Sequence, residues 1–485
     1  MTNIQSSHMF ILVFAVVASG MAGCTMPYKT LEPHPGPNVS TNFDGVKQLL
    51  KHEVANERVN HKPEVDVVFV HGMCTHNEDW ATSSLTQFAK ALGVTKKLKV
   101  EPKIIPEGSN AEIYKAVTEV GGGTVRLSAI VWTPIIYPLK GKLCYDQKKK
   151  SELCNTLAKN GSIEEKLYLP DRVWINSRAK DVLLDDCLPD AVIYQGRAKK
   201  EISEQLQNAL LAAVAPSTKP ITRAEALASA EKRGSIPLVL ITESLGSKMT
   251  LDAIQQLAMG KTGKDTITAG YVTFKRTAKI FMAANQVPLL QLADLNLRGQ
   301  MQFDMLLLRK LSFHLPAQGF FDRLDYKTVS SDAAATAAVA EVAPADRDGF
   351  YSDPLEVLYN SIGKSDAQGR KDGNTRLYSR MITPQEKEFD PLVVALSDPN
   401  DLLSYSLVGA RLVEPTLPDK SARGESHQNQ DPSLTPSYPL FDFIVSNDWG
   451  YLGLVENPYA AHTSYLAQPN IMKLIACGTQ PKDCE

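Results

Sequence analysis

The segment that decides the fold runs from Ile236 to Gly260 and has the sequence IPLVLITESLGSKMTLDAIQQLAMG. Residues 236–241 are apolar and rich in β-branched side chains, which predicts a strand buried on both faces of a parallel sheet. Apolar residues then recur every fourth position, which predicts a helix that ends at Gly260. These residues are Leu245, Met249, Ala253 and Leu257. Ser244 therefore lies on the turn between a strand and a helix.

A serine on such a turn has a chemical use. A tight strand-to-helix turn exposes the side-chain oxygen above the carboxyl edge of the sheet, and the first N–H groups of the helix face developing negative charge. The turn T-E-S-L-G departs from the G-x-S-x-G pattern, because Thr242 replaces the first glycine while Gly246 is present. The structural alternative is a serine that caps the helix.

A second strand is predicted at Val65–Val70, where an apolar run ends in His71-Gly72-Met73. Glycine lets the chain turn back over a site, so that the next backbone N–H can face a substrate carbonyl.

These two strand ends resemble those of an α/β-hydrolase of the serine esterase or lipase type. The resemblance implies the α/β-hydrolase fold, a mostly parallel central sheet flanked by helices, with cap or lid insertions. It also implies an oxyanion hole made by the N–H groups of Met73 and Leu245, and a structural role for His71. His76 and Trp80 either line the pocket or begin the next helix.

Further strands are predicted at 125–132, 278–284, 391–396 and 440–445. A helix is predicted beside the nucleophile strand from the apolar face made by Ile202, Leu206, Leu210 and Val214. Gly121, Gly122 and Gly123 precede a strand, and no Lys-Ser/Thr pair follows them, so they indicate a turn and not a phosphate loop.

Two aspartates follow the strand at 391–396, and either is a candidate for the catalytic acid. Asp401 precedes two leucines, which suits a carboxylate partly shielded from water, so we favour it. Asp398 remains the alternative, although Pro399 beside it indicates a turn.

His462 lies between the last predicted strand and a final helix around 471–475. The chain order Ser244, Asp401, His462 is the order of the α/β-hydrolase triad. The resemblance implies that His462 takes the proton of Ser244 and returns it to the leaving group, while Asp401 orients the imidazole.

The N-terminus resembles that of an exported bacterial lipoprotein. Residues 9–17 are apolar but too short to span a bilayer, and small residues follow them. Residues 21–24, Met-Ala-Gly-Cys, resemble a lipobox, which implies a signal peptide over 1–24 and a lipid on Cys24; a plain secretory signal is the alternative. Thr25 after the cysteine favours the outer membrane, by the same resemblance.

The expected organisation is therefore a tether over 25–61 and a hydrolase domain over 62–485, with insertions around 135–175 and 290–390. The expected location is the cell envelope, at the outer membrane, through the lipid anchor. A formal net charge of −2 over 485 residues gives no argument for nucleic acid as a partner.

Seven cysteines are present, and the six other than Cys24 form an even number, as in proteins of an oxidising compartment. Two pairs are close enough in sequence to form small disulfide loops, Cys144 with Cys154 and Cys477 with Cys484. Cys74 and Cys187 are either paired or free.

The expected function is hydrolysis of a small-molecule or lipid carboxylic ester through an acyl-enzyme on Ser244. No metal or organic cofactor is expected, because H-E-x-x-H, paired C-x-x-C and dinucleotide-binding glycine motifs are missing from the sequence. The alternatives are a non-catalytic scaffold or ligand-binding lipoprotein, and an acyltransferase that uses the same triad.

Overall fold

The computed structural model describes twelve stretches of the chain: 32–35, 42–55, 63–147, 151–159, 172–234, 236–259, 269, 273, 276–294, 392–407, 440–445 and 458–479. The expected signal peptide with Cys24, most of the insertion at 290–390, Gly260 and Cys484 lie outside these residues. None of the helices within them has both the length and the apolar character that crossing a membrane requires.

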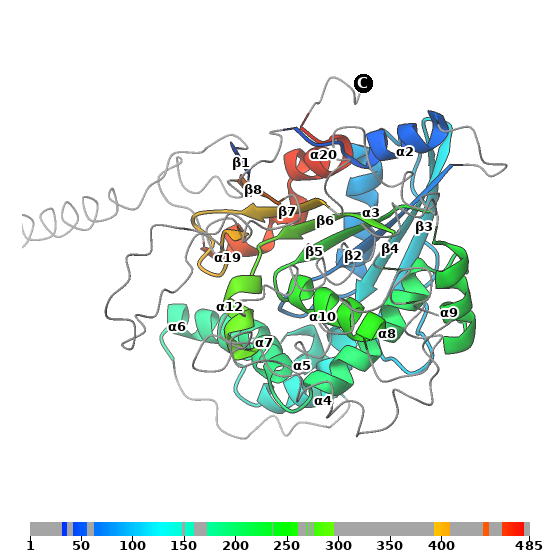
Figure 1. Ribbon diagram of the computed structural model, residues 1–485. Helices are drawn as coiled ribbons and strands as arrows, with labels where there is room; N and C mark the ends of the chain where they lie inside the picture. The colour runs from blue at the N-terminus through cyan, green and yellow to red at the C-terminus, as the bar shows by residue number, and fades with distance from the viewer. Residues whose placement is uncertain are drawn as a thin grey trace, which may run out of the picture.

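An eight-stranded sheet forms the centre of the molecule, in the order β1-β8-β7-β6-β5-β2-β4-β3 (Figure 1). The six inner strands are parallel, and the edge strands β1 and β3 are antiparallel to their neighbours. The expected α/β class with a mostly parallel sheet is therefore confirmed. The strands are β1 Glu32–Pro35, β2 Glu64–Val70, β3 Glu112–Val120, β4 Gly123–Val131, β5 Leu238–Glu243, β6 Thr277–Ala283, β7 Leu392–Ser397 and β8 Leu440–Ile444.

Helices cover both faces of this sheet (Figure 1). One face carries α2 Val46–Ala55, α3 Glu78–Ala91 and α20 Pro469–Cys477. The other carries α8 Lys199–Val214, α9 Arg223–Lys232, α10 Leu245–Met259 and α12 Val287–Gln291. Successive strand residues alternate between the two cores: Val68 and Val70 pack with α8 and α10, whereas Val67 and Phe69 pack with α3.

The predicted strands are present, and each end lies within two residues of its predicted position. β5 begins at Leu238, two residues later than predicted, because Pro237 has no N–H to give to a ladder. The predicted face of α8 is buried against the core. β1 and β3 were not predicted. The glycine turn joins β3 to β4 as a hairpin, and Gly121 and Gly122 both have positive φ angles, 54° and 88°.

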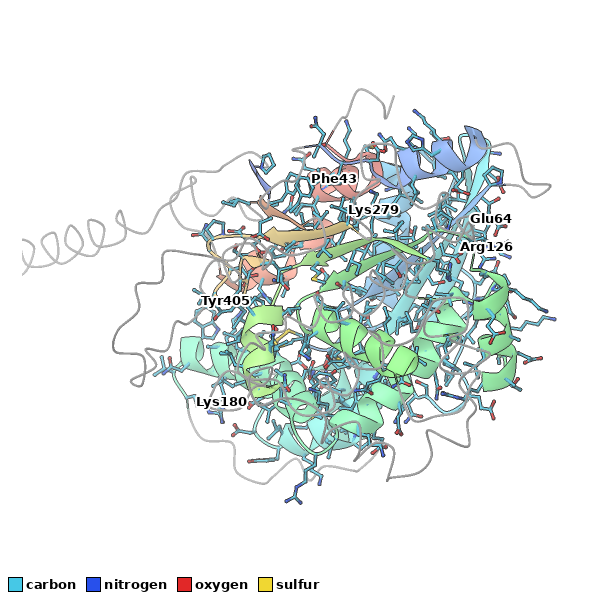
Figure 2. The ribbon with its side chains drawn as sticks, in the orientation of Figure 1. Phe43, Glu64, Arg126, Lys180, Lys279 and Tyr405 are labelled. Atoms are coloured by element: carbon cyan, nitrogen blue, oxygen red, sulfur yellow. A yellow bond between two sulfur atoms is a disulfide. The ribbon has the colours of Figure 1, made fainter. Side chains whose placement is uncertain are left out.

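The expected tether is wrong for residues 42–55, which belong to the folded body. The ring of Phe43 packs against Phe441 and Phe443, with centroids 5.5 and 5.7 Å away (Figure 2). Gln48 donates from its side chain to the carbonyl of Cys477 at 2.8 Å. Apolar burial ties this segment to α20, and β1 pairs with β8 nearby.

Short helices occupy the described parts of the expected insertion at 135–175 and the residues that follow. They are α4 Thr133–Lys140, η2 Gly141–Leu143, α5 Glu152–Lys159, α6 Trp174–Ala179, η3 Lys180–Cys187 and α7 Leu188–Gln195. A disulfide joins Cys144 to Cys154, the pairing expected from the sequence, and a second joins Cys74 to Cys187.

A network of buried and half-buried charges lies at the amino ends of β2, β4, β5 and β6. Asp66 accepts two hydrogen bonds from Arg233, at 2.9 and 2.6 Å, and one from Arg276 at 2.8 Å. Glu64 accepts from Arg126 at 3.0 Å (Figure 2). These contacts fix the end of the sheet opposite to the one that carries Ser244.

Candidate active site

Ser244 lies between the last residue of β5 and the first residue of α10, in a left-handed conformation with φ of 51°. A non-glycine residue is rarely found there, and such strained positions cluster at functional sites. The Ser244 N–H donates to the carbonyl of Ala283 on β6 at 2.8 Å, and its own carbonyl accepts from Ser247 at 3.1 Å. The turn therefore holds the serine at the carboxyl edge of the sheet.

Glycines are required where the turn meets the end of β2. A Cβ added to Gly246 would lie 2.2 Å from the carbonyl oxygen of His71, and one added to Gly72 would lie 2.7 Å from the Cβ of Ser244. Backbone from the two segments is thus in direct contact. Gly72 and Gly246 are therefore required for the same reason: a side chain at either position would collide with the other segment.

Threonine fits at position 242 because its hydroxyl has partners. Thr242 Oγ1 lies 2.9 Å from Ser247 Oγ and donates to the carbonyl of Phe281 at 3.1 Å. The side chain is buried. The departure from the glycine pattern therefore leaves no unsatisfied polar atom and causes no clash.

His462 contacts both of the other expected triad residues. It lies in the short helix α19, Pro458–Thr463, between β8 and α20. Its Nε2 is 3.1 Å from Ser244 Oγ, and its Nδ1 is 2.8 and 3.0 Å from the two oxygens of Asp401. Because a carboxylate only accepts, Nδ1 carries the proton, which leaves Nε2 as the acceptor for the serine hydroxyl.

Asp401 is buried at the turn after β7 and is held by two further donors. Its carboxylate accepts from the N–H of Leu403 at 2.9 Å and from the hydroxyl of Tyr465 at 3.1 Å. Burial, and then the charge of Asp401, raise the pKa of Tyr465 well above its usual value. The phenol therefore stays protonated and remains a donor to the carboxylate.

Asp398, the alternative acid, lies in the turn that precedes Asp401. Its Oδ1 accepts from the N–H of Asn400 at 2.9 Å, and its carbonyl accepts from the N–H of Asp401 at 3.0 Å. Its own N–H donates to the hydroxyl of Tyr465 at 2.6 Å. These are the contacts of a turn-forming aspartate, and the imidazole contact goes to Asp401.

The two expected oxyanion donors border the same turn. Leu245 is the first residue of α10, so its N–H has no partner within that helix. Met73 follows Gly72, which lies against Ser244. Neither N–H has a hydrogen-bond acceptor among the residues that the structure describes. Both amide groups therefore belong to residues at the Ser244 turn.

His71 holds the turn at the end of β2. Its Nδ1 donates to the carbonyl of Gly72 at 2.8 Å, and its Nε2 accepts from the N–H of Trp132 at 3.0 Å. Burial lowers the pKa of His71 well below its usual value, so the ring stays neutral. His76 stacks on it with ring centroids 4.4 Å apart, and burial lowers the pKa of His76 to about 4.

Trp80 lies in the first turn of α3 and contacts a polar residue that the sequence did not single out. Its indole N–H donates to Glu243 Oε2 at 3.0 Å. Burial raises the pKa of Glu243 to about 7. Glu243 directly precedes Ser244, and its position within the T-E-S-L-G turn is the sequence feature that could have identified it as part of the site.

Gln286 is the second residue that sequence reasoning missed. Its Nε2 lies 3.5 Å from His462 Nε2. The signal was its position after β6, since polar residues at the carboxyl ends of neighbouring parallel strands gather at one edge of the sheet.

A disulfide and two hydrogen bonds link the loop that carries Met73 to η3. Besides the Cys74–Cys187 disulfide, Thr75 donates to Asp186 from its N–H at 3.1 Å and from its hydroxyl at 2.5 Å. Cys74, Cys187 and Asp186 bring potential metal ligands within 4.8 Å of one another. Because the sulfurs are bonded to each other, they are not thiolates and do not offer a metal site.

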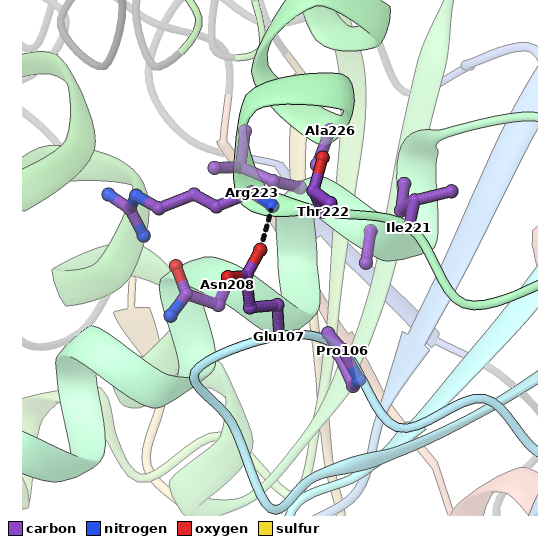
Figure 3. Close-up of a pocket in the computed structure, with 9 residues that line it drawn as sticks. Pro106, Glu107, Asn208, Ile221, Thr222, Arg223 and Ala226 are labelled. Carbon is purple, nitrogen blue, oxygen red and sulfur yellow. Dashed lines mark hydrogen bonds between the residues drawn. The ribbon is translucent and has the colours of Figure 1, made fainter.

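A depression elsewhere on the surface carries none of these groups (Figure 3). It lies between the 106–107 loop, α8 and the start of α9, where the N–H of Arg223 donates to Glu107 at 2.8 Å.

Known proteins add no assignment to this geometry. Comparison of the chain with protein-family models, with curated proteins and with solved structures found no match, so the function must be argued from the contacts of Ser244, His462 and Asp401 themselves.

Proposed function

We propose that the chain is a serine hydrolase of the α/β-hydrolase family that cleaves carboxylic esters. The observation that carries the proposal is the pair of contacts made by His462, 3.1 Å to the Ser244 hydroxyl and 2.8 Å to the Asp401 carboxylate. These residues come from three separate elements, and no structural need of the fold requires a hydroxyl, an imidazole and a carboxylate in that order.

In the proposed acylation step, Ser244 Oγ attacks the ester carbonyl carbon while His462 Nε2 takes the hydroxyl proton. The carbonyl π electrons move to the oxygen, and the N–H groups of Met73 and Leu245 stabilise the resulting charge. When the intermediate collapses, the alkoxide leaves and takes the proton from His462. Asp401 keeps the imidazole in the required tautomer and stabilises its charged form.

The placement of the turn favours catalysis over a scaffold role. Ser244 keeps a strained φ of 51°, and a serine needed only as a helix cap would not require that conformation. Met73 and Leu245 also leave two N–H groups beside it with no acceptor among the described residues. Both features favour a site built to receive a carbonyl oxygen.

The expected location is part of the proposal. We propose that Cys24 carries a lipid that holds the enzyme at the outer membrane, where its substrate is a small-molecule or lipid ester. Labelling cells with radioactive palmitate tests this, since Cys24→Ser should abolish incorporation and release the protein from the membrane fraction.

The catalytic proposal is tested by labelling the full-length protein with a fluorophosphonate, which reacts with an activated serine. Wild type should be labelled and should hydrolyse p-nitrophenyl esters, and Ser244→Ala should lose both activities. Ser203→Ala is the matched control, because this buried serine lies on α8 and bonds to Gln256 at 2.7 Å. A wild-type protein that is folded but neither labelled nor active would identify a scaffold. Transfer of the acyl group to an added alcohol in preference to water would identify an acyltransferase.

A further inference from the structure

The end of β6 repeats the geometry of the serine turn on the neighbouring strand. Ala284 follows β6 in a left-handed conformation with φ of 50°, as Ser244 follows β5 with φ of 51°. Its N–H donates to Leu396 on β7 at 3.0 Å, as that of Ser244 donates to Ala283 on β6. The two residues after Ala284, Asn285 and Gln286, are therefore held at the same edge as the triad.

The hydrogen bonds of Asn285 hold this turn in place. Its Oδ1 accepts at 3.1 Å from the N–H of Val287, the first residue of α12. Its Nδ2 donates to the carbonyl of Tyr405 at 2.9 Å, and its carbonyl accepts from the N–H of Tyr405 at 2.8 Å. These bonds join the turn to the loop that contains Asp401.

Gln286 has no such task. Its side chain makes no cap hydrogen bond to α12, and only 1 % of the residue is exposed. The partner of its amide among the described residues is His462 Nε2, at 3.5 Å. Within the described part of the chain, the side-chain nitrogen of Gln286 therefore has no closer polar partner than His462 Nε2.

The contact of Gln286 lies at the atom where the chemistry takes place. In the free enzyme the Nε2 lone pair accepts the Ser244 hydroxyl at the shorter distance of 3.1 Å. In an acyl-enzyme that hydroxyl is esterified and donates no longer. The lone pair is then available to an incoming water, and the amide of Gln286 is within reach of the same place.

We propose that Gln286 positions the water that deacylates the enzyme, an inference that rests on the proposed function. The amide N–H of Gln286 donates to one lone pair of the water, while one water hydrogen points at His462 Nε2. The second lone pair is left to face the acyl carbon. One hydrogen bond to a protein amide and one to the base together fix the orientation of the nucleophile.

The water oxygen forms a bond to the acyl carbon, its proton passes to His462 Nε2, and the carbonyl π electrons move to the oxygen. When these electrons return, the bond to Ser244 Oγ breaks, and the serine oxygen takes the proton from His462. The products are a carboxylic acid and the free enzyme, and Gln286 gains or loses no proton.

The two half-reactions give a test, because His462 is the base in both while Gln286 is required in one. Phosphonylation of Ser244 by a fluorophosphonate reports the first step. Recovery of activity after carbamoylation by a p-nitrophenyl carbamate reports attack by water. Gln286→Ala should recover about tenfold more slowly, the effect of losing one hydrogen bond to the nucleophile, and should be phosphonylated within about threefold of the wild-type rate.

Gln207→Ala is the matched control, because this buried amide donates to Gln256 near the carboxyl end of α10, whereas Ser244 precedes the amino end of that helix. It should leave both rates unchanged. Gln286→Met keeps the volume and removes the hydrogen bond, so it gives the same test if the alanine variant does not fold. Equal slowing of both steps would show that Gln286 only holds His462, and an unchanged recovery rate would also refute the inference. A wild type that is never phosphonylated would instead refute the proposed function.

Discussion

Gly246→Ala should separate the serine turn from the loop that carries Met73. The added Cβ would lie 2.2 Å from the carbonyl oxygen of His71 and 3.0 Å from that of Val70, both backbone atoms at the end of β2. Ordinary van der Waals contact begins near 3.4 Å, so the turn and β2 must move apart by about 1.2 Å. Such overpacking costs about 1–3 kcal/mol of unfolding free energy.

The same displacement should reduce activity by more than the loss of stability explains. A misplacement of ~1 Å between reacting groups lowers the rate about 100-fold. Urea unfolding measures the change in stability. The value of kcat/KM for a p-nitrophenyl ester, determined on protein shown to be folded, measures the change in activity. Gly196→Ala is the control, because its Cβ would lie 3.1 Å from its nearest neighbour on an exposed helix end, with ordinary φ. Wild-type values for both quantities in Gly246→Ala would refute the described contact.

Asp401→Asn should lower kcat by about 10 000-fold with the fold retained, since it removes the carboxylate that orients the imidazole. Asp398→Asn should keep kcat within about threefold of the wild-type value, because an asparagine side chain also accepts hydrogen bonds in such turns. Steady-state kinetics of both variants measures the two effects. Replacing Cys74 and Cys187 together by serine should lower the unfolding free energy by about 2–4 kcal/mol, because their bond closes a long loop in the unfolded chain, and denaturant titration of the oxidised wild type and the variant measures this. Burial raises the pKa of Glu243 to about 7 from 4.5, so the folded state binds more protons between these values and stability should fall as the pH rises from about 4.5 to about 7; Glu243→Gln should remove this fall in urea unfolding at pH 5 and pH 8.

The strands that could be predicted are those with an unbroken apolar run of at least four residues, such as 67–70, 280–283 and 392–396. A strand buried on both faces needs such a run, so composition alone locates β2, β6 and β7. The expected triad followed from short polar motifs after these runs, because parallel strands bring their carboxyl ends to one edge. Choosing Asp401 over Asp398 required the additional argument that Pro399 indicates a turn.

β3 escaped prediction because its polar residues interrupt the apolar pattern. Lys115 lies in the middle of this strand and is buried, since its ammonium group donates to the carbonyls of Ala212, Ala215 and Ser217 at 2.7, 2.5 and 2.8 Å. These acceptors are at the end of α8, about 100 residues away in sequence. A lysine satisfied by tertiary contacts cannot be distinguished from an exposed one in its local sequence.

Gln286 was not predicted from the sequence for a related reason. A glutamine between a strand and a helix is ordinary in sequence, and its meaning depends on His462, which lies 176 residues further along the chain. The segment at 42–55 was mistaken for a tether because its polar surroundings outweigh a few apolar residues. Phe43 and Val46 nevertheless fill a space that α20 and β8 create only in the folded protein.

If Cys24 carries the proposed lipid, the pairing of β1 with β8 limits the distance between the folded body and a membrane. Glu32, the first residue of β1, lies eight positions after Cys24, and a fully extended chain of eight residues spans at most about 28 Å. The chain between a lipid on Cys24 and β1 would then be short, so the sheet edge at β1 would lie nearest the bilayer and the edge at β3 would point away from it. A spin label placed at Gly121, on the hairpin beyond β3, should then sense the lipid headgroups far less than one placed at Pro33.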